Sequence, residues 1–252
     1  MKKAIFITVR AGSSRLPNKA ILEINGKPTI QLLIERAKRS KMADMVILCT
    51  STEPEDTILC DIASRCGINS FRGSLIDKVD RWRAAAKHYN VDYFVNIDGD
   101  DLLCEPELID MAFRQYHSEE HDFIKVDDTR IVCGAFTLGA KTSAIEEVCR
   151  LKTTTDTEAL WLSFSSIPSF KTVMLQNIPN VFYRPEIRAT LDYEEDLAFF
   201  DAIFSHFKRL NNKNFSLRDV VDFIDKNPQV VQINRHRHQD YLDNQKKLNK
   251  IL

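Results

Sequence analysis

The chain has 252 residues, of which 44% are hydrophobic and 28% charged, and its formal net charge at pH 7 is -1. This length allows one large domain with a sizeable core, and the small net charge excludes a broadly cationic surface for nucleic acid or anionic lipid. The charges are nevertheless segregated. Residues 1–41 hold ten Lys and Arg against two Glu, a local net charge of +8, and residues 98–110 hold six carboxylates and no base.

The cysteines and the N-terminus indicate a cytoplasmic protein. Six cysteines are scattered without a CxxC pair, and several stand inside apolar runs, which is typical of reduced core thiols. The apolar runs are short and interrupted by charges, and Met1 is followed by two lysines and a strand-like segment without a small-residue cleavage site. The sequence therefore predicts neither a signal peptide nor a transmembrane helix, and we expect no membrane or nucleic-acid partner.

In chain order, the first half alternates buried strands with amphipathic helices. Continuous apolar and β-branched runs predict strands buried on both faces, and apolar residues spaced three and four apart predict helices. The strands are expected at residues 4–9, 45–50 and 93–97, and the helices from Pro28, over 53–66, over 75–89 and up to about Tyr116. This alternation indicates an α/β fold with a mostly parallel sheet covered by helices on both faces.

From about Val126 the alternation becomes irregular. The patterns predict a strand at 131–138, a helix at 142–151, a mixed stretch, a short strand at Arg188, a helix with phenylalanines on one face and a helix opened by Ser216. The last residues, 231–252, are polar and predict a weakly helical surface arm. We therefore expect a single domain over residues 1–230, followed by this arm.

A basic loop, RAGSSRLPNK, directly follows the first predicted strand. Its glycine and serines can turn successive N–H groups toward one anion, its arginines can bind phosphate in a bidentate manner, and its lysine adds a point charge. The loop lacks the GxxxxGK[ST] pattern of a P-loop, and a salt-bridged surface turn is the alternative explanation. Its position after a buried strand favours a polyanion site made by Arg10, Gly12, Ser13, Ser14, Arg15 and Lys19.

An acidic loop follows the strand predicted at 93–97 and contains Asp98, Asp100 and Asp101. Two unit charges about 4 Å apart repel by about 4 kcal/mol at an effective dielectric constant of 20, so water or a cation must relieve the repulsion. Mg2+ favours one or two carboxylates together with substrate phosphates, whereas an Asx turn before the next helix is the structural alternative. Because ligands of open α/β sheets bind beyond the carboxyl ends of the strands, both loops can border one cleft.

A third acidic segment, LDYEED, stands near the start of a predicted helix. Asp192 and Glu195 have the spacing of a capping box, which explains Asp192 without any metal. A capping carboxylate can still offer its second oxygen to an ion, so both interpretations of Asp192 stay open.

Together these three segments resemble the cytidylyltransferases, especially 3-deoxy-manno-octulosonate cytidylyltransferase and the spore-coat polysaccharide cytidylyltransferase-like proteins. RAGSSRLPNKAILEINGKP matches the family's Arg-x-x-Ser-x-Arg-Leu-Pro-x-Lys and Gly-Lys-Pro, DKVDRW its Asp-Arg pair, VNIDGDD its Gly-Asp metal loop and LDYEEDLAFF its late Asp-x-x-Glu-Asp-Leu. The resemblance covers roughly residues 3–110 and 188–200. It implies a three-layer Rossmann-like nucleotidyltransferase fold in which residues 127–187 form a small insertion for acceptor binding and dimerisation.

The resemblance also implies roles for individual residues. Arg15, Lys19, Asp100 and Asp192 would be catalytic, and Asp100 and Asp192 would bind Mg2+. Asp80 and Arg81 would lie near the nucleotide or the acceptor, although an intrahelical pair of Arg81 with Asp77 explains that arginine equally well. The implied nucleotide site consists of Arg10, Ala11, Gly12, Ser13, Ser14, Arg15, Lys19, Asp80 and Arg81.

The function implied is a Mg2+-dependent CTP:acceptor cytidylyltransferase. An oxygen of a small anionic acceptor, such as a 2-keto-3-deoxy sugar acid or a phosphorylated or phosphonate molecule, would attack the α-phosphate of CTP and release pyrophosphate. The product would be a CMP- or CDP-linked precursor for surface polysaccharide, and the family implies a homodimer. Two alternatives stay open, namely an A-type glycosyltransferase with an Asp-x-Asp metal site and a non-catalytic nucleotide-binding protein.

Overall fold

One seven-stranded sheet organises the part of the chain that the computed structural model describes, which is residues 1–13, 15–158, 160, 164 and 167–248. The strand order is β5-β4-β1-β6-β8-β7-β9, and β8 runs antiparallel to both neighbours while the other pairs are parallel. The mostly parallel sheet is thus confirmed. Its strands are β1 (Lys3–Thr8), β4 (Met45–Ser51), β5 (Asn69–Gly73), β6 (Tyr93–Asp98), β7 (Phe123–Lys125), β8 (Leu138–Lys141) and β9 (Thr172–Met174), and β2 (Glu23–Ile24) and β3 (Lys27–Pro28) form a separate hairpin.

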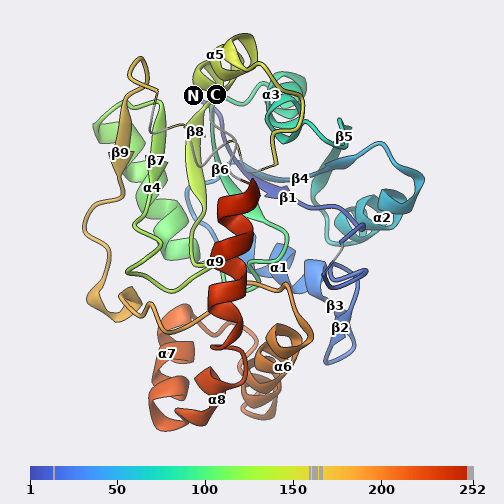
Figure 1. Ribbon diagram of the computed structural model, residues 1–252, viewed down its shortest axis with the longest axis vertical. Helices are drawn as coiled ribbons and strands as arrows, with labels where there is room; N and C mark the ends of the chain where they lie inside the picture. Colours follow the sequence, from blue (N-terminus) through green and yellow to red (C-terminus); the bar gives the residue numbers. More distant parts are fainter. Residues whose placement is uncertain (14, 159, 161–163, 165–166, 249–252) are drawn as a thin grey trace.

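Helices cover both faces of the sheet and produce three layers (Figure 1). Helices α1, α2 and α4 pack on the face that carries Ile5 and Ile7, and α3 and α5 pack on the face that carries Ala4 and Phe6. The helices are α1 (Thr29–Ala37), α2 (Thr57–Arg65), α3 (Lys78–Tyr89), α4 (Pro106–Ser118), α5 (Thr142–Leu151), α6 (Glu194–Arg209), α7 (Leu217–Lys226), α8 (Gln229–Gln232) and α9 (Arg237–Leu248), with 3-10 turns at η1 (Pro54–Asp56) and η3 (Asn180–Phe182).

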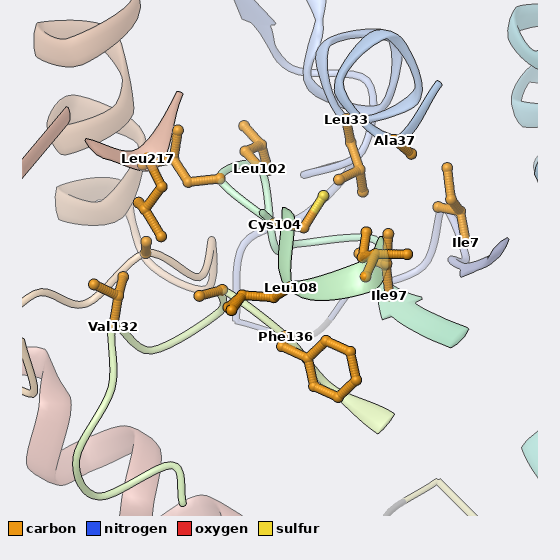
Figure 2. Packing of buried hydrophobic residues seen from close by; sticks show 14 of the residues in the cluster. Ile7, Leu33, Ala37, Ile97, Leu102, Cys104, Leu108, Val132, Phe136 and Leu217 are labelled. Carbon is orange, nitrogen blue, oxygen red and sulfur yellow. The ribbon is translucent and has the colours of Figure 1, made fainter. Parts of the chain in front are cut away.

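The larger core lies on the α1 face of the sheet. Figure 2 shows Ile7 and Ile97, from the neighbouring strands β1 and β6, close to Leu33 of α1, with Leu108 of α4 in the same cluster. Each of these four side chains is at most 1% exposed, and full burial of one such side chain stabilises the fold by about 1.5–3 kcal/mol. The alternation of side chains along β1 therefore fixes which helices cover which face, and it holds the strand ends in place.

The region after β7 differs from the prediction. The strand predicted at 131–138 is wrong in position, because β8 begins only at Leu138. Gly134 has φ +84, and a Cβ at this position would lie 2.3 Å from the carbonyl oxygen of Ala189. The chain turns there, so Cys133 makes only an isolated bridge with Arg188, where a short strand was predicted. The apolar residues of this segment fill the core instead of extending the sheet.

Helices α6 to α9 form the C-terminal part of the described chain, and in Figure 1 they lie at the lower end of the molecule, from which α9 extends upward. Ser216 opens α7 with the predicted capping box to Asp219. Helix α9, which falls within the predicted arm, is joined to the start of α6 by an ion pair of Arg237 with Glu195, at 2.9 Å. No helix in the described residues has the length and apolar character needed to cross a bilayer.

Candidate active site

The basic and acidic loops meet at the carboxyl end of the sheet. Strands β1 and β6 are adjacent and parallel, with Thr8 opposite Asp98, so both loops leave the same edge. Gly99 N–H donates to the carbonyl oxygen of Thr8 at 2.8 Å. A Cβ on Gly99 would lie 2.5 Å from the Cβ of Val9, so only glycine allows the loops to approach this closely.

A backbone hydrogen bond brings the third acidic segment to the same place. The N–H of Leu191 donates to the carbonyl oxygen of Asp100 at 2.9 Å, and this contact places Asp192 beside the acidic loop. The Asp192 residue is 1% exposed. The buried carboxylate of Asp192 therefore lies beside the partly exposed carboxylate of Asp100, although the two residues are far apart in the sequence.

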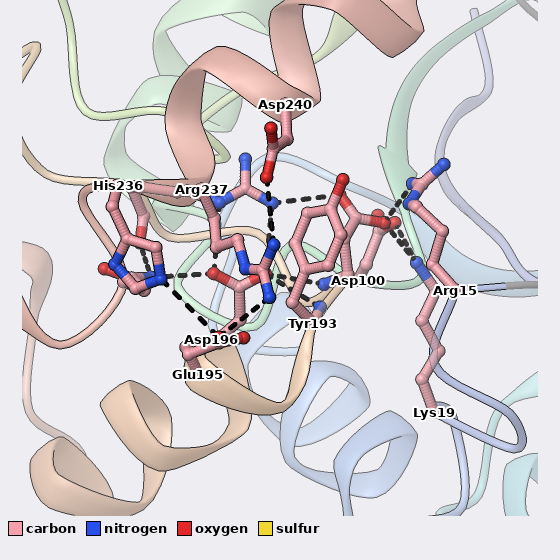
Figure 3. A network of polar contacts seen from close by, with 12 residues as sticks. Arg15, Lys19, Asp100, Tyr193, Glu195, Asp196, His236, Arg237 and Asp240 are labelled. Carbon is pink, nitrogen blue, oxygen red and sulfur yellow. Dashed lines mark hydrogen bonds and ion pairs between the residues drawn. The ribbon is translucent and has the colours of Figure 1, made fainter.

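Two cations of the basic loop contact these carboxylates (Figure 3). Lys19 Nζ lies 2.5 Å from Asp100 Oδ2 and 2.9 Å from Asp192 Oδ1, and Arg15 Nη2 lies 2.5 Å from Asp192 Oδ1. Arg188, which is 1% exposed, reaches the other oxygen of Asp192 at 3.1 Å. The structure thus brings together Arg15, Lys19, Asp100 and Asp192, the four residues that the resemblance implies as catalytic.

The protonation equilibria of this group reflect a crowded set of charges. Burial alone would lower the pKa of Lys19, but Asp100 and Asp192 outweigh it and raise that pKa. Burial would raise the pKa of Asp192, yet the charges of Lys19 and Arg15 hold it well below its usual value. Asp100 has a raised pKa, because burial and the nearby carboxylates of Asp192 and Asp98 outweigh Lys19. A further cation near Asp100 would relieve this crowding.

Asp192 is not the helix cap that its spacing suggested. Helix α6 begins one residue later, with Tyr193 as N-cap, and Asp196 rather than Glu195 completes the capping box. Asp196 accepts the N–H groups of both Asp192 and Tyr193, at 2.8 and 3.0 Å. Of the two interpretations of Asp192, the helix cap is therefore wrong. Asp196 closes the capping box, and the carboxylate of Asp192 contacts Lys19, Arg15 and Arg188 instead.

The donor set fits a hard divalent cation that a substrate helps to bind. The ammonium group of Lys19 already bridges Asp100 and Asp192, which shows that a cation can contact both carboxylates at once. Within the described ranges, no group of three or more His, Cys, Asp or Glu could hold a metal ion by itself. Mg2+ is commonly held by one or two carboxylates with water and substrate phosphates, so Asp100 and Asp192 could hold it with a triphosphate present.

The described residues of the basic loop before Arg15 do not contact Asp100 or Asp192. The N–H of Ala11 donates to the carboxylate of Asp56 at 2.6 Å and is therefore committed to the interior. Gly12 is exposed and Ser13 half-buried, whereas Ser14 falls outside the described residues. Arg10 contacts neither Asp100 nor Asp192; it donates to Glu158 and to the carbonyl oxygen of Leu75, each at 3.0 Å.

Asp80 and Arg81, the Asp-Arg pair on α3, form side-chain hydrogen bonds or ion pairs with neither the described residues of the basic loop nor Asp77. Asp80 binds Arg83 at 2.6 Å and lines a polar surface cavity of about 400 Å³ between α3 and α5. Arg81 is 1% exposed and donates to the carbonyl oxygen of Ser74 at 2.7 Å. Asp77 instead binds Lys152 and caps α3. The intrahelical pair of Asp77 with Arg81 is therefore wrong, and Asp80 does not join the cluster around Asp100.

Sequence reasoning missed three residues that support the site. Arg188 anchors Asp192, Asp56 holds Ala11, and Lys78, which is 2% exposed, donates to Asp98 at 2.7 Å. A signal was present for Arg188, because it stands four residues before Asp192. Asp98 accepts from Lys78 and Asn96 rather than from Lys19. The carboxylate that shares Lys19 with Asp100 is therefore Asp192 and not Asp98, its partner in the Asp-x-Asp pattern.

The family is decided by comparison with known proteins. A family model described as cytidylyltransferase matches residues 4–185. The chain belongs to the cytidylyltransferase family. It is therefore an enzyme of the nucleotidyltransferase class, as the basic loop and the two aspartate segments predicted.

Individual relatives agree with this family. The chain is 31% identical to an uncharacterised protein of Methanocaldococcus jannaschii over 95% of this chain and 97% of that protein. It is 23% identical to the spore coat polysaccharide biosynthesis protein SpsF of Bacillus subtilis, over 89% and 95%. It is also 31% identical to a 3-deoxy-manno-octulosonate cytidylyltransferase of Pelobacter propionicus, over 66% and 62%.

A solved structure supports the fold assignment. The structure of a cytidylyltransferase from Leptospira borgpetersenii superimposes with a TM-score of 0.84 at 28% identity and covers 92% of this chain and 97% of that one. This match confirms the three-layer α/β cytidylyltransferase fold over almost the whole chain.

Proposed function

We propose that this cytidylyltransferase transfers CMP from CTP to a small anionic acceptor and requires Mg2+. The observation that carries the proposal is the convergence of Arg15 and Lys19 with Asp100 and Asp192 at one edge of the sheet. Cations that face two neighbouring carboxylates are the arrangement needed when both a triphosphate and a divalent metal must be held together. The relatives named as cytidylyltransferases support CTP as the nucleotide.

In this reaction an acceptor oxygen forms a bond to the α-phosphorus of CTP, and the bond to the bridging oxygen of pyrophosphate breaks. Arg15 and Lys19 neutralise the triphosphate and the leaving pyrophosphate, and Arg10 joins them once it releases Glu158. Asp100 and Asp192 would hold Mg2+, which stabilises the negative charge that develops on the phosphates. Arg188 keeps Asp192 oriented through its carboxylate contact at 3.1 Å.

The acceptor site is proposed to lie beside residues 127–187, with α9 near its border. Arg188 Cζ lies 4.7 Å from the ring centre of Tyr241 in α9, and it also contacts Asp192. The name of one relative, 3-deoxy-manno-octulosonate cytidylyltransferase, favours a 2-keto-3-deoxy sugar acid as the first acceptor class to test, and that of SpsF favours surface polysaccharide synthesis. A phosphorylated or phosphonate molecule is the second acceptor class that we propose to test. Dimerisation through residues 127–187 is part of the same proposal, and six free cysteines favour the cytoplasm as its location.

The proposal is tested by measuring pyrophosphate release from CTP and Mg2+ with a panel of these acceptor classes. The wild type should release pyrophosphate with one class, and Asp100→Asn and Arg15→Ala should each lower the rate by at least about 100-fold. Lys27→Met is a matched control, because among the described residues Lys27 forms an ion pair with exposed Glu35 alone.

Other outcomes would count against the proposal in distinguishable ways. Release of free CDP or UDP from a nucleotide sugar would support a glycosyltransferase. CTP binding without pyrophosphate release for any acceptor class would support a non-catalytic nucleotide-binding protein. Full activity in both site variants would refute the assignment of Asp100 and Arg15.

A further inference from the structure

Asp56 stands at a helix start but does not cap that helix. It occupies the N-cap position of α2, where an aspartate usually accepts N–H groups of the first turn, yet its side chain makes no capping hydrogen bond. Instead the carboxylate turns back toward the sheet and is 1% exposed. The local explanation for an aspartate at this position therefore fails, and the side chain must have another role.

The carboxylate joins the end of β4 to the basic loop. Oδ2 accepts from Thr50 Oγ1 at 2.9 Å, from Ser51 N at 3.0 Å and from Ser51 Oγ at 2.5 Å, and Oδ1 accepts from Ala11 N at 2.6 Å. The end of β4 thus holds Oδ2 in place, and Oδ1 in turn holds the basic loop at Ala11. Burial alone would raise the pKa of Asp56, but these hydrogen bonds outweigh it and lower that pKa, so the group stays an anion.

A buried anion with this environment is unusual. Buried charges are normally paired with an opposite charge, and no ion pair of Asp56 is found among the residues that the structure describes. Four hydrogen bonds balance the charge instead. The N–H of Ala11 has no other acceptor among the residues that the structure describes. The contact that needs the carboxylate is the one with the loop.

We propose that Asp56 is a positioning residue that holds the triphosphate-binding loop in its binding conformation through the N–H of Ala11. This inference rests on the proposed function, because it assumes that the loop holds the phosphates of CTP. Fixing Ala11 leaves Gly12 and Ser13 as the described residues whose amides can turn toward a phosphate. The same hydrogen bond holds the part of the loop that leads to Arg15, so a displaced loop would lower the affinity for the nucleotide.

Asp110 supplies a matched control. It is 7% exposed and likewise accepts several hydrogen bonds, from Ser40 Oγ at 2.5 Å and from the N–H groups of Lys41 and Met42. It therefore joins α4 to the connection between α1 and β4, which contains none of the proposed site residues. Replacing either aspartate removes a buried anion that organises a loop, but only Asp56 contacts the basic loop.

The experiment compares Asp56→Asn with Asp110→Asn by calorimetric titration of CTP in Mg2+, with the melting temperature of each variant recorded. The side-chain oxygen of an asparagine can accept a hydrogen bond from the N–H of Ala11 or of Ser51. Its NH2 group cannot accept the other one, so one of the two contacts is lost. Asp56→Asn should weaken CTP binding about tenfold, whereas Asp110→Asn should change it less than about twofold at a similar loss of melting temperature. Hydrogen exchange should rise at residues 9–16 only in Asp56→Asn and at 40–44 only in Asp110→Asn.

A milder variant keeps the test decisive if Asp56→Asn does not fold. Ser51→Ala removes one hydrogen bond that orients the carboxylate, and it should weaken CTP binding about threefold while the maximal rate of pyrophosphate release changes less. Equal loss of CTP affinity in Asp56→Asn and Asp110→Asn would overturn the inference. If Asp56→Asn does not fold, unchanged CTP affinity in Ser51→Ala would overturn it. A wild type that does not bind CTP at all would overturn the proposed function, and this inference with it.

Discussion

Replacing Lys19 by methionine tests whether a cation holds the two carboxylates together. In the structure the ammonium group contacts both Asp100 and Asp192, and the Lys19 side chain is 16% exposed. Lys19→Met keeps the length of the side chain and removes the charge. The carboxylates of Asp100 and Asp192, 21% and 2% exposed, then lie near each other without the bridging cation.

The expected cost follows from the burial and from the cations that remain. Removing one partner of a buried ion pair typically costs about 3–5 kcal/mol. Asp192 retains Arg15 and Arg188, so we expect about 2 kcal/mol for Lys19→Met in EDTA. For a chain of this size, 1 kcal/mol shifts the melting temperature by about 2–4 °C, which gives a decrease of about 4–8 °C.

Mg2+ should reverse much of this loss. In the wild type Mg2+ must displace Lys19 from the carboxylates of Asp100 and Asp192, whereas in Lys19→Met no ammonium group competes for them. Mg2+ should therefore raise the melting temperature of the variant more than that of the wild type. The measurement is a series of thermal scans in EDTA and at rising Mg2+, with Lys27→Met as the control for loss of a surface charge. An unchanged melting temperature of Lys19→Met in EDTA, or the same response to Mg2+ in both proteins, would show that Lys19 does not hold the two carboxylates together.

Three further predictions concern the scaffold. Gly99→Ala forces a Cβ to 2.5 Å from Val9 and should lower the free energy of unfolding by about 1–3 kcal/mol, whereas Gly12→Ala meets nothing within 4 Å and should melt near the wild type. Burial lowers the pKa of His121 below 6.5, so as the pH falls the unfolded chain binds a proton at this residue at a higher pH than the folded chain does. The free energy of unfolding, measured in urea, should therefore fall from pH 7.5 to 5.5, and it should fall less steeply in His121→Gln. Arg237→Gln should raise hydrogen exchange in α9 while the melting temperature falls by less than about 2 °C, because its ion pair with Glu195 is partly exposed.

The strand-end loops could be predicted from the sequence because their position depends on local patterns. Buried apolar runs predict both segments as strands of one mostly parallel sheet, and the loops that follow such strands can open at the same edge. Arg15, Lys19 and Asp100 were therefore accessible to reasoning from the residues. Asp192 was accessible only through the family resemblance, since its spacing to Glu195 offered an adequate local explanation.

The remaining parts of the site depend on contacts that no local pattern shows. Asp56 contacts Ala11, 45 residues earlier in the chain, and an aspartate before a helix reads as an ordinary cap. The turn at Gly134 depends on the close approach of Ala189, so the apolar run around it was predicted as a strand. In both cases tertiary contacts override the local preference.

The most direct test of the account is the affinity of the wild type, Arg15→Ala and Asp100→Asn for CTP, each measured calorimetrically with Mg2+ and with EDTA. The central claim is that the basic loop and the paired aspartates form a single site for a nucleotide and a divalent ion. We predict that Mg2+ strengthens CTP binding by the wild type, that Arg15→Ala weakens binding in both conditions, and that Asp100→Asn loses most of the Mg2+ effect. Wild-type binding that is indifferent to Mg2+ and unchanged in both variants would contradict it.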